Sequence, residues 1–181
     1  MNIIVRATIL RATMVALLIC SSLLSAASDD AYRLGQGDHV QIRVFGEDDL
    51  TVEIHINATG VVSYPFLGEL LISGKTSGEL EQTIVEGLKP DYLVNPVVHV
   101  SILQYREFYI YGEVNAPGEY SFEPGMTLRK AIVLAGGFSE RAAKKNIVIV
   151  HEDNPGMTEK RSNLDTPIQP GDVIDVKQTF F

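Results

Sequence analysis

The chain has 181 residues, 45% of them apolar and 21% charged, with a formal net charge of −8 at pH 7. This composition is typical of a globular protein with one domain or two small ones, and it argues against a disordered chain. The acidic balance argues against nucleic acid as a partner, because Lys and Arg carry phosphate binding. Four His, one Cys and no Trp argue against a disulfide framework, a metal cluster or redox chemistry.

Residues 1–27 have the pattern of a secretory signal peptide. Arg6 and Arg11 are the only charges in this segment, an apolar run follows them, and small residues end the segment at Ala27. We expect cleavage between Ala27 and Ser28, which leaves 13 basic and 23 acidic residues in the mature chain.

Two alternatives to cleavage would place the chain on a membrane. An uncleaved anchor is less favoured, because the apolar run is short for a full span and is interrupted by Cys20 and several serines. A lipid anchor on Cys20 is also less favoured, because Ile19 stands where lipoprotein processing sites have a small residue. We therefore expect a soluble mature protein that begins at Ser28.

Strand signals dominate residues 32–70. Apolar residues alternate with polar ones at 40–44 and again at 52–56, which is the period of a strand with one buried face. Turn residues at 46–49 and 57–60 separate these segments. We expect a β-rich first unit.

A helix signal follows the strands of this unit. Thr76 and Glu79 fit a capping box, apolar side chains then recur one turn apart up to Leu88, and Pro90 ends the helix. Residues 97–103 are apolar at nearly every position, which predicts a strand buried on both faces or at an interface.

The second unit begins with a hairpin and a short helix between residues 107 and 142. Alternating apolar residues lead into a turn at Pro117 and Gly118, Thr127 can cap a helix, and a pair of glycines ends that helix. Such a helix cannot bury its apolar face on two strands alone, so we expect strands at 146–150 and 172–176 to complete the sheet. The predicted fold is a small β-grasp unit.

Two strand entries contain similar turns. Gly35, Gly37 and Asp38 precede the first strand, and Gly171 and Asp172 precede the last. In both, Gly permits a tight turn and Asp can accept hydrogen bonds from nearby backbone amides. We interpret this similarity as repeated turn chemistry rather than as proof of duplication.

The residue patterns predict no catalytic, cofactor-binding or metal site. The histidines are far apart in sequence, no nucleophile-elbow pattern occurs, and the glycine pairs lack the context of a nucleotide-binding loop. Tyr105, Tyr109 and Tyr111 are candidates for a glycan-stacking surface or a subunit interface. Core packing is the alternative, although strand alternation would direct Tyr109 and Tyr111 to the face opposite Phe108.

Short motifs recur in a fixed order along nearly all of the mature chain. They are YRLGQGD at 32–38, VFG at 44–46, LG at 67–68, GEV at 112–114, PG at 117–118 and 124–125, AGG at 135–137 and PGD at 170–172. Together they resemble the outer-membrane polysaccharide export (OPX, Wza-like) family, whose secreted members form ring-shaped exit conduits for capsular polysaccharide and exopolysaccharide.

The resemblance implies an α+β fold of two domains after the signal peptide at 1–27. A β-rich polysaccharide-export domain would occupy 28–104, and a ubiquitin-like β-grasp (SLBB) domain would occupy 105–181. Long members of the family carry further β-grasp modules and a C-terminal helix that crosses the outer membrane, whereas this chain ends five residues past Val176. We therefore expect it to resemble the short periplasmic members, which need a separate outer-membrane barrel.

The function that the resemblance implies is non-enzymatic. The chain would be a periplasmic subunit, associated with the outer membrane, of a homo-oligomeric ring that takes a polysaccharide as cargo. Its partners would be an outer-membrane β-barrel and an inner-membrane polysaccharide co-polymerase, and it would need no cofactor. The alternative is a monomeric periplasmic module that binds a glycan or another ligand, and an enzyme acting on polysaccharide ranks third.

Overall fold

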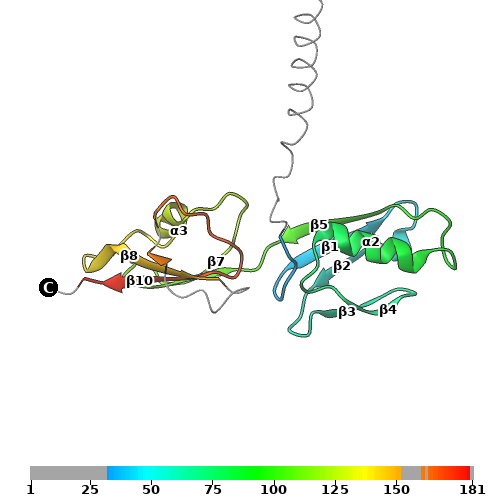
Figure 1. The fold of residues 1–181 in the computed structure, drawn as a ribbon, viewed down its shortest axis with the longest axis horizontal. Helices are drawn as coiled ribbons and strands as arrows, with labels where there is room; N and C mark the ends of the chain where they lie inside the picture. Colours follow the sequence, from blue (N-terminus) through cyan, green and yellow to red (C-terminus); the bar gives the residue numbers. More distant parts are fainter. Residues whose placement is uncertain (1–31, 152–159, 162, 180–181) are drawn as a thin grey trace, which may run out of the picture. The chain divides into compact units, whose positions relative to one another are not determined.

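The computed structural model describes residues 32–151, 160–161 and 163–179, and these form an α+β fold as the sequence predicts (Figure 1). The strands of the N-terminal part are β1 (His39–Val44), β2 (Val52–His55), β3 (Val61–Tyr64), β4 (Gly68–Leu71) and β5 (Val98–Gln104). A 3₁₀ turn, η1 (Asp48–Leu50), and a helix, α2 (Ser77–Leu88), lie between them. In the part of the chain that the structure describes, no helix is both long enough and apolar enough to cross a membrane.

The first sheet has the order β2-β1-β5, and both of its strand pairs are antiparallel. The predicted alternation is confirmed in β1, where Val40, Ile42 and Val44 are buried while Arg43 is exposed. A two-stranded hairpin of β3 and β4 completes this part. The Tyr64 side chain of that hairpin is buried, and its hydroxyl donates to the Leu50 carbonyl oxygen at 2.8 Å, so the buried polar group is satisfied.

Helix α2 begins with the predicted capping box. The Glu79 amide donates to the Thr76 hydroxyl at 3.1 Å, and the Thr76 amide donates to the Glu79 carboxylate at 2.8 Å. Leu80, Ile84 and Leu88 are fully buried and attach the helix to the core. Local capping chemistry and helical periodicity therefore agree in this segment.

Replacing Thr76 with alanine should lower the free energy of unfolding by about 1 kcal/mol, the usual cost of losing an N-cap hydroxyl. Urea denaturation followed by far-ultraviolet circular dichroism measures this loss, since the chain has no Trp. Gln82→Ala, on the exposed face of the same helix, is the matched control and should change stability little. An equal loss in both variants would contradict the role of the cap.

The cap should also weaken in acid. The hydrogen bond from the Thr76 amide is the main cause that lowers the pKa of Glu79 below its ordinary value of 4.5. A carboxyl group whose pKa is lowered on folding stabilises the folded state fully when the pH is above its ordinary pKa. That stabilisation is lost as the pH falls through the lowered pKa. The stability difference between the native chain and Glu79→Ala should therefore shrink as the pH falls below 4.5.

Strand β5 is less buried than its composition predicts. Val100 is buried, but Leu103 is 47% exposed and Val97, just before the strand, is 59% exposed. The expectation of burial on both faces is wrong, because β5 is the edge strand of a three-stranded sheet. The Glu81 carboxylate of α2 accepts from the outer amide of Val100 at 2.8 Å, which occupies one donor of an otherwise open edge.

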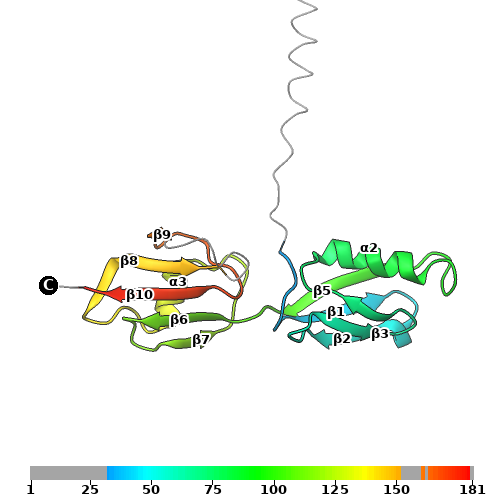
Figure 2. The same ribbon diagram turned by 60° about the horizontal axis from the view of Figure 1, so that its bottom comes forward.

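The C-terminal part is a second sheet with one helix. Its elements are β6 (Phe108–Gly112), β7 (Gly118–Tyr120), α3 (Leu128–Leu134), β8 (Ala142–Val150), β9 (Lys160–Arg161) and β10 (Val173–Gln178). The strand order is β7-β6-β10-β8-β9, and β10 is parallel to β6 and antiparallel to β8. Figure 2 shows β8, β10, β6 and β7 side by side, with α3 behind them. The hairpin, the helix and the two later strands are all confirmed.

Helix α3 packs on one face of this sheet. Thr127 caps it, as predicted, by accepting a hydrogen bond from the Lys130 amide. Leu128, Ala131 and Ile132 of the helix are buried in one apolar cluster with Phe108 and Ile174 of the sheet. The opposite face of the sheet carries no helix in Figure 2, and it holds the tyrosines that the sequence singled out.

Candidate functional site

Strand β6 divides its side chains between a buried face and an open face. Phe108 and Ile110 are at most 1% exposed beneath α3, whereas Tyr109 and Tyr111 are 46% and 47% exposed. The predicted alternation is confirmed, and core packing is excluded for these two rings. Tyr105 lies just before the strand, is half-buried, and meets the Phe122 ring edge-on with centroids 5.5 Å apart.

These three residues, which we call the tyrosine tract, line two adjoining pockets. Tyr105 and Tyr109 line a cavity of about 540 Å³, and Tyr109 and Tyr111 line a more open one of about 650 Å³. Tyr109 and Val173 belong to both linings, so the cavities adjoin at β6 and β10. The structure therefore brings together all three tyrosines that the sequence proposed, along one tract.

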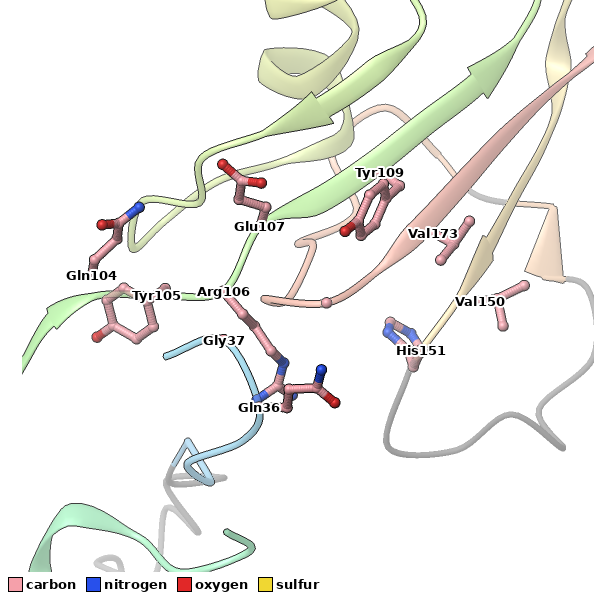
Figure 3. Close-up of a pocket in the computed structure, with 11 residues that line it drawn as sticks. Gln36, Gly37, Gln104, Tyr105, Arg106, Glu107, Tyr109, Val150, His151 and Val173 are labelled. Atoms are coloured by element: carbon pink, nitrogen blue, oxygen red, sulfur yellow. The ribbon is translucent and has the colours of Figure 1, made fainter. Parts of the chain in front are cut away.

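Hydrogen-bonding side chains surround the rings. Gln36, Gln104, Glu107 and His151 line the first cavity. Figure 3 shows Tyr109 on β6 and His151 just past the end of β8, and β10 lies between these two strands. Glu119 lines the second cavity and is the cross-strand partner of Tyr109. Amides, carboxylates and phenols beside aromatic faces suit a ligand that has both apolar faces and many hydroxyl groups.

Arg106 also lines the first cavity, but its charge is committed to Asp38. Its guanidinium lies 3.6 Å from the Asp38 carboxylate, and its backbone amide donates to the same carboxylate at 2.8 Å. Both residues are buried, with Arg106 7% exposed and Asp38 0%. Figure 3 shows the Arg106 side chain extending toward Gln36 and Gly37. The sequence carried no signal for this pair, because the partners are 68 residues apart.

The two turns that resembled each other in sequence have the same hydrogen bonds. The Gly35 amide donates to Asp38 at 2.8 Å, and the Gln169 amide donates to Asp172 at 2.7 Å, so each Asp closes the turn before its strand. The second oxygen of Asp172 lies 2.7 Å from His151 Nδ1. Burial raises the pKa of Asp172, and the hydrogen bonds from Gln169 and His151 oppose that rise.

Tyr111 lies opposite a buried carboxylate on the neighbouring strand. Asp175 pairs with Tyr111 across β6 and β10, is 7% exposed, and forms an ion pair with Lys177. Burial and then Asp175 raise the pKa of Tyr111, through charge and a side-chain hydrogen bond.

Titration of the Tyr111 phenol should detect the effect of Asp175. Asp175→Asn removes the negative charge beside the phenol, so the pKa of Tyr111 should fall. It should stay above its ordinary value, because burial of the phenol also raises it. Ultraviolet absorbance of tyrosinate, with Tyr111→Phe to identify the signal, measures the change. In the native chain the environment that raises this pKa stabilises the folded state fully when the pH is below the ordinary pKa of 10.0. That stabilisation is lost as the pH rises through the raised pKa of Tyr111.

Glu119→Gln is the matched control for that titration, because Glu119 is on the other side of β6 and pairs with Tyr109. It should leave the midpoint of Tyr111 unchanged. An unchanged midpoint in Asp175→Asn would show that Asp175 does not act on the phenol.

The end of β6 approaches β10 closely. Gly112 has a φ of 85°, and a Cβ there would lie 2.3 Å from the Val176 carbonyl oxygen and 3.1 Å from Asp175 Oδ1. Only glycine fits both this backbone conformation and this space. The close approach keeps Asp175 beside Tyr111.

Two of the histidines that are far apart in sequence lie close together in the fold. His39 and His55 are cross-strand partners whose rings stack with centroids 3.8 Å apart. Within residues 32–151 and the described segments that follow, no group of three or more His, Cys, Asp or Glu is placed to hold a metal ion. The expected cleavage site at Ala27 and Ser28, and the alternative lipid site at Cys20, lie outside the described residues.

Comparison with known proteins gives both parts of the chain a family. Residues 26–103 match the polysaccharide biosynthesis/export protein family, and residues 108–159 match the SLBB domain.

Three relatives are named for related processes. The exopolysaccharide production protein ExoF of Rhizobium meliloti (strain 1021) is 36% identical over 133 residues, which cover 66% of this chain and 31% of ExoF. The polysialic acid transport protein KpsD of Escherichia coli is 28% identical, covering 65% of this chain and 22% of KpsD. The EPS I polysaccharide export outer membrane protein EpsA of Ralstonia nicotianae (strain ATCC BAA-1114 / GMI1000) is 30% identical, covering 60% of this chain and 35% of EpsA.

The chain thus spans about a third of the length of these relatives or less. Its two family matches follow one another in sequence, and the β-rich first part and the helix-backed second sheet agree with that order. The chain therefore belongs to the polysaccharide export family, with an export domain followed by an SLBB domain.

Proposed function

We propose that the chain is a periplasmic, ring-forming subunit of an apparatus that exports capsular polysaccharide or exopolysaccharide. In this role it conducts the polymer toward a separate outer-membrane barrel and performs no chemistry on it. The observation that carries the proposal is the succession of an export domain and an SLBB domain on one chain. The names of the relatives ExoF, KpsD and EpsA, which refer to polysaccharide production, transport and export, support it.

The proposal divides the chain into a signal peptide at 1–27, an export domain at 28–104 and an SLBB domain at 105–181. The homo-oligomer would work with an outer-membrane β-barrel and an inner-membrane polysaccharide co-polymerase. Its negative charge suits a solvated periplasmic surface and not a nucleic-acid partner.

Deletion of the gene, followed by localisation of the polymer, tests the proposed function. We expect surface polysaccharide to fall and polymer to accumulate inside the envelope, and plasmid-borne wild-type protein to restore export. A plasmid whose product lacks residues 1–27 is the matched control and should restore nothing. Unchanged surface polysaccharide in the deletion strain would refute the proposal.

Assembly needs its own measurement. Light scattering of the mature protein, alone and with envelope extract, should show a species of several subunits. Cross-linking in cells should yield a ladder of oligomers together with an outer-membrane partner. A monomer under all of these conditions would refute the ring while leaving a role in export intact.

The second candidate is a monomeric periplasmic module that binds a glycan. The exposed tyrosine tract along two adjoining cavities favours it. Oligosaccharide binding by a stable monomer, together with normal export in the deletion strain, would select this candidate over the conduit.

A further inference from the structure

The tyrosine tract offers rings that are held in place before any ligand arrives. Tyr105 packs edge-on against Phe122, and Tyr111 lies opposite the buried Asp175 in the pairing of β6 with β10. Tyr109 and Tyr111 are two residues apart on one strand, which places them about 7 Å from each other on the same face. Rings that are already ordered lose little entropy when a ligand stacks on them.

Groups that can bond to hydroxyls lie on both sides of these rings. The amides of Gln36 and Gln104 can both donate and accept, and the carboxylates of Glu107 and Glu119 accept. Sugar rings present C–H groups on their faces and hydroxyls at their edges. Aromatic faces bordered by amides and carboxylates complement both kinds of group.

The charges along the tract decide which sugars fit. The basic side chains at its border are already engaged with aspartates: Arg106 with Asp38, His151 with Asp172, and Lys177 with Asp175. Glu107 is one of the residues that line the first cavity, and Glu119 is one of those that line the second. A polyanion would meet like charge in each cavity, whereas hydroxyls would find acceptors there.

We infer that the tyrosine tract binds a neutral, hydroxyl-rich segment of polysaccharide and discriminates against polymers rich in uronate or other acidic groups. The inference rests on the proposed function, because it takes the exported polymer as the ligand. The adjoining pair of cavities at β6 and β10 suits several consecutive sugars rather than a single one.

The test uses the full-length protein after export to the periplasm, with two sets of probes. The first set consists of oligosaccharides cut from the surface polymer of the encoding strain. The second is an oligogalacturonate and its methyl ester, which share a backbone and differ in charge. Binding is measured by calorimetry and by saturation-transfer NMR at low and at high salt.

We expect the surface-polymer fragments, or the methyl ester, to bind with an affinity that salt hardly changes, and the oligogalacturonate to bind at least about tenfold more weakly than its ester. Replacing both Tyr109 and Tyr111 with alanine should weaken binding about tenfold or more. Replacing both with phenylalanine keeps the rings and should retain most of the affinity. Tyr92→Ala removes another exposed ring, outside both cavities, and should have no effect.

Glu119→Gln should narrow the difference between the acid and its ester, because it removes one like charge from the tract. Tighter binding of the oligogalacturonate than of its ester by the native protein would overturn the inference. Full affinity in the folded double-alanine variant, or no binding of any probe by the native protein, would also overturn it.

These outcomes are distinct from a failure of the proposed function. A deletion strain that loses surface polymer, complemented fully by the double-alanine variant, would uphold export and overturn the binding tract. Unchanged polymer in the deletion strain, with neutral probes bound at the tract, would refute the conduit and leave the glycan site in place.

Discussion

Replacing Asp38 with alanine is expected to lower the free energy of unfolding by about 3–5 kcal/mol, the range for breaking a buried ion pair from one side. Asp38 is fully buried and accepts hydrogen bonds from the amides of Gly35 and Arg106. Its carboxylate also faces the buried guanidinium of Arg106 at 3.6 Å. The variant would leave that cation buried beside two amides that have lost their acceptor.

A double-mutant cycle separates the charge from the turn. Asp38→Ala combined with Arg106→Met removes both charges and should lose less stability than the two single changes added together. Asp49→Ala, on an exposed turn, should change stability by no more than about 0.5 kcal/mol. Additive losses in urea denaturation would show that the two side chains do not stabilise each other.

Gly112→Ala should destabilise the second sheet by about 2–5 kcal/mol. About 1–2 kcal/mol comes from placing a Cβ on left-handed backbone, and about 1–3 kcal/mol from overpacking. The new Cβ would lie 2.3 Å from the Val176 carbonyl oxygen, so β6 and β10 would have to separate at this point. Tyr111 and Asp175 would then lose their register, and oligosaccharide binding should weaken as well.

Substitutions at two other glycines separate the backbone cost of Gly112→Ala from its packing cost. Gly125 has a φ of 79° with no heavy atom near its absent Cβ, so Gly125→Ala should show only the backbone cost of about 1–2 kcal/mol. Gly118 has open space and no positive φ, so Gly118→Ala should be nearly neutral. Equal losses at Gly112 and Gly125 would show that the approach to Val176 contributes nothing.

Features set by neighbouring residues were predictable from the sequence. The capping box at Thr76, the hairpin around Pro117 and the cap at Thr127 depend on side chains within a few positions of one another. The alternation that exposes Tyr109 and Tyr111 is also local, since a strand directs successive side chains to opposite faces. For the same reason the roles of the two turn aspartates, Asp38 and Asp172, could be predicted.

Features set by distant pairing were not predictable. The high apolar content of β5 suggested burial, but its place at a sheet edge leaves Leu103 exposed. In the sequence Arg106 comes just after a strand, where a solvent-exposed cation is common. It contacts Asp38 because the tertiary fold brings these two distant segments together. The stacked pair of His39 and His55 likewise depends on the register of β1 with β2.

The candidate site follows the same division. Its three tyrosines could be proposed from spacing, whereas Val173 and Asp175 join them through the parallel pairing of β10 with β6. No short-range pattern predicts which strand lies beside which. The proposed discrimination against acidic polymers therefore depends on long-range pairing, which places the carboxylates and the engaged cations around the rings.

The central place of β10 has a consequence for how the chain is made. β10 comes after β6 and β8 in sequence yet lies between them in the sheet, so a chain emerging N-terminus first presents its outer strands before the strand that joins them. Until β10 emerges, Phe108 and Ile147 lack Ile174 and Val176, two members of the cluster that buries them, and nascent chains should engage chaperones during this interval. The first sheet and α2 are complete at Gln104, and Arg106, the partner of Asp38, follows two residues later. We therefore expect that part to become protease-resistant while the second sheet is still incomplete.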